Sequence, residues 1–225
     1  MNKWVIDISH HNGMINFPKV KKAGIKAIIH KVLEGKSAID AMFTANLPRM
    51  LAQGFYVGGY HFIRGTRGKE QADRFLQIVN DLQVIHKCEI LPAIDAEDGQ
   101  ITLKELIKSS EEFATYIIEQ TGKYPLFYIN RSSVVSASKK GYLKDSVLVK
   151  CPLWVARYNS VLGSIPEWDN YTLWQYTDSG SVDGINGYVD LNDFSGTDLK
   201  HLFTSIAEAE NGKDIDNPDA KQAIR

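Results

Sequence analysis

The sequence predicts an α/β fold, an irregular TIM-like β/α barrel in which five βα units are followed by three further strands. Short apolar segments alternate with amphipathic segments through the first 130 residues. Beyond residue 130 the segments between strands are short and rich in Gly, Pro, Asn and Asp. A length of 225 residues suits one such domain. We expect the barrel over residues 1–206 and a disordered tail over residues 207–225, which carry few large apolar side chains.

Eight segments have the apolar or aromatic composition of buried strands. They are residues 4–8, 26–32, 55–62, 91–98, 125–129, 153–156, 171–176 and 187–194. Helical spacing of apolar residues predicts helices at residues 17–23, 40–53 and 69–82, and Gly54 suits the end of the second. Thr102 and Glu105 form a capping-box pattern before a long helix that ends near Thr121.

Composition argues against several kinds of partner and cofactor. The 26 basic and 27 acidic residues give a formal net charge of −1, which does not favour nucleic acid or an anionic membrane. Cys88 and Cys151 lie far apart and outside any CxxC spacing, so they predict neither a zinc site nor a disulfide. No apolar run has the length of a signal peptide or a membrane span. We expect a soluble monomer without a cofactor or metal.

Two carboxylates mark the end of the fourth predicted strand. Asp95 and Glu97 stand two positions apart, so they project from the same face with Cα atoms about 6.7 Å apart. Like charges this close raise the pKa of one partner, which leaves one carboxyl as an acid and the other as a base or charge stabiliser. That division suits cleavage of a glycosidic bond. The alternative is a pair of solvated acids at the start of a loop.

Most of the polar and aromatic candidates fall at the C-terminal ends of predicted strands. In a barrel these ends converge on one mouth, where such enzymes place their sites. For each aromatic residue alone the alternative is core packing, and for Glu34 a loop-facing charge. Adjacent His10 and His11 would face opposite ways on a strand, which disfavours a shared metal. The candidates are Asp7, Glu34, Tyr60, His61, Phe62, Asp95, Glu97, Tyr128, Asn130, Trp174, Gln175, Tyr176 and Asp190.

An ordered set of motifs resembles the glycoside hydrolase family 25 lysozymes, which are N-acetylmuramidases. The set covers the chain from about residue 3 to residue 200. It comprises WVIDISHHNG at 4–13, KVLEG at 31–35, GGYHF at 58–62, LPAIDAED at 91–98, YPLFYIN at 124–130, LWVARY at 153–158, LWQYTDSG at 173–180 and GYVDLNDFSG at 187–196. The family commonly has Thr where Leu33 stands. We expect no wall-binding module, although such modules are frequent in the family.

The resemblance implies a catalytic barrel that cleaves the β-1,4 bond from N-acetylmuramic acid to N-acetylglucosamine in peptidoglycan. It implies that Glu97 is the general acid and Asp95 its partner, with Asp7 and Asp190 lining the same pocket. Configuration would be retained, with the 2-acetamido group of the substrate as the nucleophile. Tyr60, Tyr128 and Trp174 would supply stacking faces and hydrogen bonds, among the substrate-binding positions Glu34, Tyr60, His61, Phe62, Tyr128, Asn130, Trp174, Gln175 and Tyr176.

Other functions stay open at this point. A chitinase-like hydrolase also uses DxE on a barrel strand, although it carries a longer acidic run where this chain has Leu91, Pro92 and Ala93. A non-catalytic sugar-binding barrel and a metal-dependent hydrolase using Asp7, His61 and Asp95 are further alternatives. We expect no signal peptide, and on that expectation an enzyme acting on the cell wall fits best as a phage lysis enzyme released through a membrane pore. A secreted effector and a sequence from which a leader has been removed stay open.

Overall fold

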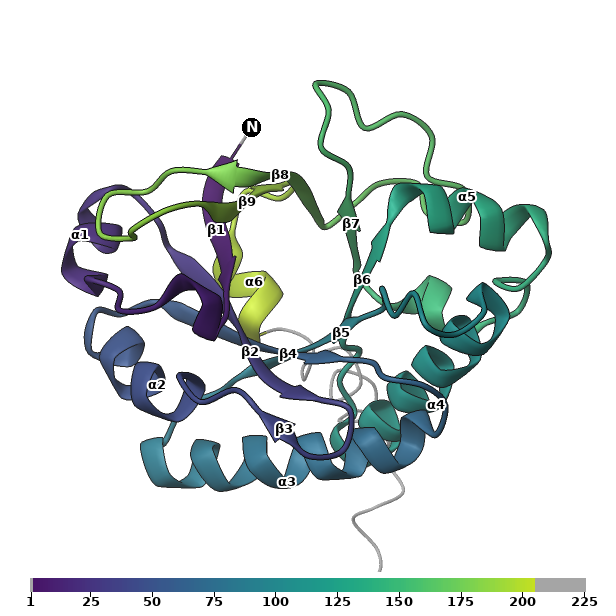
Figure 1. Ribbon diagram of the computed structural model, residues 1–225, viewed down its shortest axis with the longest axis horizontal. Helices are drawn as coiled ribbons and strands as arrows, with labels where there is room; N and C mark the ends of the chain where they lie inside the picture. The colour runs from purple at the N-terminus through teal and green to yellow at the C-terminus, as the bar shows by residue number, and fades with distance from the viewer. Residues whose placement is uncertain (1, 205–225) are drawn as a thin grey trace, which may run out of the picture.

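The computed structural model describes residues 2–204 and shows a closed barrel (Figure 1). The hydrogen-bonded strand order is β1-β9-β8-β7-β6-β5-β4-β2-β3. A further pairing of β1 with β2 closes the eight strands from β1 to β2 in this order into a barrel, and β3 lies outside the closed ring. Strands β1, β2 and β4 to β8 run parallel to their neighbours, whereas β9 is antiparallel to β8 and β1. The predicted α/β barrel is therefore confirmed, while the tail at 207–225 lies outside the described residues.

All eight predicted strands are present. The structure adds a ninth, β3, a two-residue strand that folds back on the end of β2 after a tight turn. The bounds are β1 Asn2–Ile8, β2 Ala27–Glu34, β3 Ala38–Ile39, β4 Tyr56–Phe62, β5 Leu91–Asp95, β6 Leu126–Asn130, β7 Leu153–Ala156, β8 Leu173–Gly180 and β9 Val189–Phe194.

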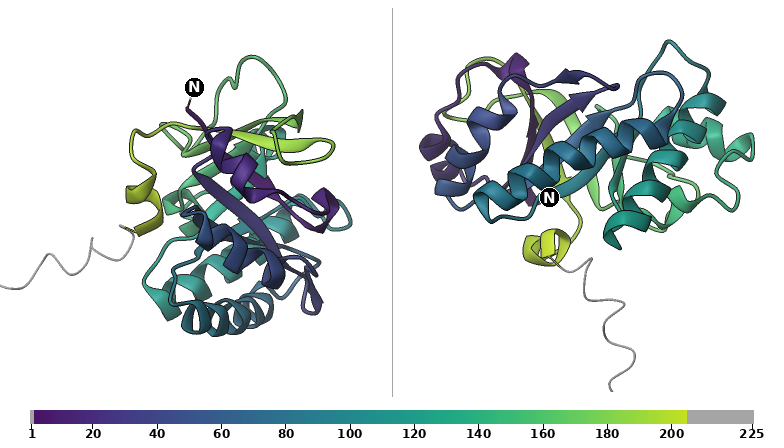
Figure 2. Two further views of the ribbon diagram at one scale, coloured as in Figure 1. Left: turned by 90° about the vertical axis from the view of Figure 1, so that its left-hand side faces the viewer. Right: turned by 90° about the horizontal axis from the view of Figure 1, so that it is seen from below.

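Five helices of the described residues, α1 to α5, cover the outside of the barrel along its first six strands, and a sixth, α6, packs at one end of it. They are α1 Phe17–Lys22, α2 Phe43–Ala52, α3 Gly68–His86, α4 Leu103–Thr121, α5 Arg131–Lys139 and α6 Leu199–Thr204, with short 3-10 turns at His10–Asn12 and Val147–Lys150. Helix α4 begins at the predicted capping box, in which Thr102 and Glu105 bond each other's backbone N–H groups. Helix α5 completes the fifth βα unit, and α3 and α4 pack side by side (Figure 2).

Alternation along the strands separates two apolar layers. In β2, Ala27 and Ile29 face the barrel interior, while Ile28 and Val32 face the surrounding helices. The interior layer also contains Leu199, Leu202 and Phe203 of α6, so this helix covers the end of the barrel opposite the mouth. The same alternation decides which polar side chains point into the mouth. No helix within residues 2–204 is long and apolar enough to cross a membrane.

We expect Gly68→Ala to lower the free energy of unfolding by about 2 kcal/mol or more, because overpacking against a backbone is hard to relieve. Gly68 is the first residue of α3, and a Cβ there would overlap the carbonyl group of Ser109 in α4. Urea unfolding followed by circular dichroism measures the change. Gly99→Ala supplies the control, since a Cβ at Gly99 meets no atom within 4 Å; an equal loss at both positions would contradict close helix packing as the cause.

Candidate active site

Five carboxyl groups gather at the mouth of the barrel. Asp7 comes from β1, Asp95 from the end of β5, Glu97 from the loop after it, Asp178 from β8 and Asp190 from β9. Together with aromatic and amide side chains they line a cavity of about 160 Å³. The other lining residues are Tyr60, Tyr128, Trp154, Tyr158 and Gln175.

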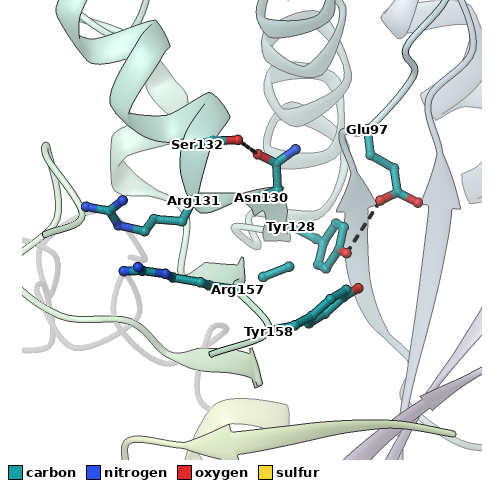
Figure 3. Close-up of a pocket in the computed structure, with 8 residues that line it drawn as sticks. Glu97, Tyr128, Asn130, Arg131, Ser132, Arg157 and Tyr158 are labelled. Atoms are coloured by element: carbon teal, nitrogen blue, oxygen red, sulfur yellow. Dashed lines mark hydrogen bonds between the residues drawn. The ribbon is translucent and has the colours of Figure 1, made fainter. Parts of the chain in front are cut away.

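A second cavity of about 380 Å³ adjoins this acidic cavity (Figure 3). The two cavities share the side chains of Glu97, Tyr128 and Tyr158. Asn130, Arg131, Ser132, Ala156 and Arg157 complete the lining of the larger one. Glu97 therefore stands where the two cavities meet, and a ligand lying across both would pass over its carboxyl group.

Asp95 points into the barrel at the base of the acidic cavity. Its side chain shares the interior face of β5 with Leu91 and Ala93, and the residue is only 7% exposed. Burial, the charge of Glu97 and the charge of Asp7 raise the pKa of Asp95 well above its ordinary value. Its buried Oδ1 atom has no hydrogen-bond partner within the described residues. A buried carboxyl without such support costs stability, which favours a functional role.

Glu97 is the more accessible member of the pair. Strand β5 ends at Asp95, and the backbone N–H of Ala96 still donates to the carbonyl of Tyr128, so the next side chain that points toward the mouth is Glu97. The Tyr128 hydroxyl lies 3.5 Å from Glu97 Oε2, at the limit of a hydrogen bond. Partial burial and the charge of Asp7 raise the pKa of Glu97. A raised pKa favours the protonated form that a general acid needs.

A hydrogen-bond network fixes the opposite wall. The Gln175 amide nitrogen donates to both oxygens of Asp7 at 3.1 and 3.0 Å, and Asn192 Nδ2 donates to Asp7 Oδ2 at 2.8 Å. The Gln175 Oε1 atom accepts from the hydroxyls of Tyr128 and Tyr158 at 3.0 and 2.9 Å. These contacts are compatible with only one orientation of the Gln175 amide group, because its oxygen meets donors and its nitrogen meets acceptors.

Asp190 faces Asp7 across the β1–β9 pair, and their carboxyl groups share a hydrogen bond. Burial, followed by the charge of Asp7, raises the pKa of Asp190 to about 9. Burial also raises the pKa of Asp7, but amide donors from Gln175 and Asn192 oppose this shift. The amide donors therefore favour the charged form of Asp7 over that of Asp190.

Residues 6–185 match the sequence profile of the glycosyl hydrolases family 25. The chain belongs to this family. The match confirms the resemblance seen in the motifs, and together with relatives named lysozyme and muramidase it indicates a glycoside hydrolase.

Individual relatives of this family 25 chain are named lysozymes. The autolytic lysozyme of Clostridium acetobutylicum is 31% identical over 194 residues, which cover 84% of this chain and 55% of the relative, so the chain spans about half of its length. Lysozyme M1 of Streptomyces globisporus is 29% identical over 206 residues, covering 88% and 69%. A crystal structure of a bacterial lysozyme from Streptomyces coelicolor superposes with a TM-score of 0.75 at 25% identity, covering 90% and 97%.

An ionic network supports the loop that carries Glu97 in this family 25 barrel. Arg64, just after β4, donates to Glu34 at 2.7 Å and to Asp98 at 3.1 Å. Asp98 also accepts from the backbone N–H groups of Gly65 and Gln100. Glu34 in turn pairs with Lys31, so the network joins the ends of β2 and β4 to the loop after β5. Glu34 thus supports the site rather than lining either cavity.

Side-chain alternation separates residues that the sequence analysis grouped together. Tyr60 faces the acidic cavity, but its neighbour His61 faces the helices, where its ring stacks on Phe113 and Nε2 lies 3.0 Å from Gln71. Gln175 likewise faces the cavity. His61, Trp174 and Tyr176 therefore line neither cavity. Consecutive strand residues point to opposite faces, which also separates His61 from Asp7 and Asp95.

The remaining candidates contribute at the edge of the site. Trp174 donates to the backbone oxygen of Arg157, and Tyr176 packs among the outer apolar side chains. Phe62 lies under Lys31 and Arg64, whose charged groups stand 5.1 and 4.3 Å from its ring centre. Asn130 lines the larger cavity, and its Oδ1 atom accepts from Ser133 N at the start of α5.

Sequence reasoning missed several lining residues. Trp154, Ala156 and Tyr158 stand two positions apart, so their side chains point to the same face at the end of β7. The alternation within the motif LWVARY could therefore have identified Trp154 and Tyr158 as lining residues. Alternation along the sequence could not identify Asp178, because a register shift between Gln175 and Thr177 changes the face on which β8 presents its side chains. Within residues 2–204, no group of three or more His, Cys, Asp or Glu residues has an arrangement suited to a metal ion.

We expect Asp190→Asn to flatten the dependence of stability on pH. The pKa of Asp190 is about 9 in the fold, against an ordinary value of 3.8. The folded state therefore keeps a proton that the unfolded chain releases, and its stability falls as pH rises from about 4 to about 9. Asparagine cannot ionise, so this part of the decline disappears. Urea unfolding at pH 5, 7 and 9 measures it, with Asp183→Asn at an exposed position as control; parallel curves for both variants would contradict it.

Proposed function

We propose that this family 25 protein is a lysozyme, a 1,4-β-N-acetylmuramidase that hydrolyses the bond from N-acetylmuramic acid to N-acetylglucosamine in bacterial peptidoglycan. The observation that carries the proposal is the placement of Asp95 and Glu97 against one cavity at the barrel mouth. Relatives named autolytic lysozyme and lysozyme M1 support the choice of substrate. The site of action is then the bacterial cell wall.

Glu97 acts as the general acid in this proposal. Its raised pKa keeps a proton available, and its position between the two cavities suits a glycosidic oxygen held across them. Proton transfer to that oxygen breaks its bond to the anomeric carbon of muramic acid. Glu97, now ionised, later takes a proton from the water that attacks the intermediate.

The substrate's own 2-acetamido group is the proposed nucleophile, with retention of configuration. Its carbonyl oxygen bonds to the anomeric carbon as the leaving group departs, which gives a positively charged oxazolinium ring, and water then reopens this ring. Asp95 lies at the base of the cavity and is only 7% exposed, so it suits support of the ring better than attack on the sugar. The developing positive charge favours the ionised form of Asp95, which in turn stabilises that charge.

The other lining residues hold the sugar. Tyr60, Tyr128, Trp154 and Tyr158 offer aromatic faces and hydroxyl groups, which suit pyranose rings with apolar faces and polar edges. Asp7 and Gln175 are fixed by the amide and tyrosine network, so the wall opposite Glu97 is preorganised before substrate arrives. Asp190 completes this wall.

Digestion of purified peptidoglycan tests the proposal. After reduction of the products with borohydride, mass spectrometry should find new reducing ends on muramic acid. Chitin oligosaccharides form the comparison substrate. Cleavage that leaves only glucosamine reducing ends would replace the proposal with a chitinase-like activity. Binding of both substrates by folded protein without any cleavage would replace it with a sugar-binding barrel.

A further inference from the structure

Two arginines line the larger cavity on the side away from Glu97. Arg131 is the first residue of α5, and Arg157 directly follows β7. Figure 3 shows their side chains running side by side, with both guanidinium groups pointing away from Glu97. Neither residue takes part in the acid chemistry described above. They form what we call the arginine pair.

The loop after β7 holds the two guanidinium groups together. Arg131 Nε donates to the carbonyl of Ser164 at 3.0 Å, and Arg157 Nη1 donates to that of Leu162 at 2.5 Å. A Cβ built on Gly163 would stand 2.8 Å from Arg157 Nη1 and 3.3 Å from Arg131 Nη2. Both groups therefore approach the same point of the loop, and two positive charges are neighbours.

No carboxylate neutralises the arginine pair within residues 2–204. Among the ion pairs of this region, Arg64 contacts both Glu34 and Asp98, whereas neither Arg131 nor Arg157 contacts an acid. Each keeps guanidinium N–H groups that no carbonyl of the loop occupies. Adjacent like charges repel, and an anion with two oxygens would relieve the repulsion through charge-assisted hydrogen bonds.

The site as a whole is electrostatically polarised. The acidic cavity holds five carboxyl groups, and the arginine pair stands in the adjoining cavity. A negatively charged substituent on a glycan is repelled by the first cavity and attracted by the second. The charge distribution would therefore decide which way an alternating glycan strand lies across Glu97.

We propose that Arg131 and Arg157 form a subsite for a carboxylate carried by the glycan. This inference rests on the proposed function and refines its substrate. On peptidoglycan the carboxylate has two sources: the lactyl group of muramic acid where no peptide is attached, and the peptide chain where one is. The subsite holds the substituent and takes no part in bond cleavage.

Three substrates distinguish these sources. The first is peptide-bearing peptidoglycan, the second the same material with its carboxylates converted to amides, and the third glycan strands stripped of peptide. Arg131→Gln and Arg157→Gln are each expected to raise KM about tenfold, with kcat unchanged, on the substrate that carries the recognised carboxylate, and to have no effect on the amidated one. An effect on the first substrate that is lost on the third assigns the peptide carboxylate, an effect on the third substrate alone assigns the lactyl carboxylate, and no effect on either overturns the subsite. Lys139→Gln on α5 removes the same charge elsewhere and serves as control.

A binding measurement separates this inference from the proposed function. Calorimetry with soluble peptide-bearing fragments, in a Glu97→Gln background that blocks cleavage, reports affinity alone. Weaker binding of the carboxylate form in the arginine variants supports the subsite even where the parent protein cleaves nothing. Equal affinity for the carboxylate and amidated forms in the parent overturns it. Arg131→Gln alone carries the test if Arg157→Gln unfolds by circular dichroism.

Discussion

Glu97→Gln is expected to lower kcat for wall lysis by at least about two orders of magnitude, the lower range for loss of a positioned general acid. Glutamine keeps the size of the side chain but has no proton to give to the leaving oxygen. The fold should not change, because Glu97 is exposed at the mouth and its one polar contact in the described structure is the 3.5 Å approach of the Tyr128 hydroxyl, whose proton is donated at shorter distance to Gln175. Turbidity of a cell-wall suspension and release of reducing ends both measure the rate.

Two controls accompany this variant. Glu111→Gln in α4 makes the same chemical change away from the mouth and should leave kcat unchanged. Circular dichroism checks that the Glu97 variant is folded. Near-normal turnover by a folded Glu97→Gln protein would remove Glu97 from the acid role and leave the proton donor to be sought among Asp95 and Asp190.

Asp95→Asn is expected to lower kcat by about two orders of magnitude or more while making the protein more stable. The activity falls because a neutral amide cannot balance the positive charge of the intermediate. The stability rises because burial and the charges of Glu97 and Asp7 raise the pKa of Asp95, so ionising it costs free energy in the fold. That cost is absent below the ordinary pKa of 3.8 and grows as pH rises, so the gain should grow with pH.

Thermal unfolding at several pH values measures the gain, which we expect to reach at least about 2 °C at neutral pH. Asp98→Asn is a matched control that is expected to change the stability in the opposite direction. Burial alone would raise the pKa of Asp98, but hydrogen bonds from Gly65, Gln100 and Arg64 lower it, so its charge is stabilising and the control should lose stability. A loss of stability in both variants would contradict the cost assigned to Asp95.

Much of the fold could be predicted from local pattern, because strands buried in a barrel are short apolar runs and amphipathic helices repeat every 3.6 residues. Strand β3 could not, since two exposed residues carry no such pattern. The end of β5 could also be predicted from the sequence, because Asp95 and Glu97 interrupt an apolar strand. The alternation of side chains along a strand applies to His61 and Trp174 as well. The prediction that neighbouring residues at a strand end all face the mouth did not take it into account.

The electrostatics of the site depended on distances that the sequence does not contain. Repulsion between Asp95 and Glu97 predicted one raised pKa, whereas in the fold both are raised, with burial as the largest cause. Burial at the base of the cavity comes from strands far apart in the chain. Gln175 and Asp7, which define the opposite wall, are separated by 168 positions.

The seam between β1 and β9 joins the first described strand of the chain to the last. Asp7 and Asp190 face each other across it, and Asn192 reaches from β9 to Asp7. A nascent chain still lacking β9 on the ribosome therefore has neither a closed barrel nor a complete wall opposite Glu97. A chain that ends before β9 is therefore expected to lack the hydrolytic activity proposed here.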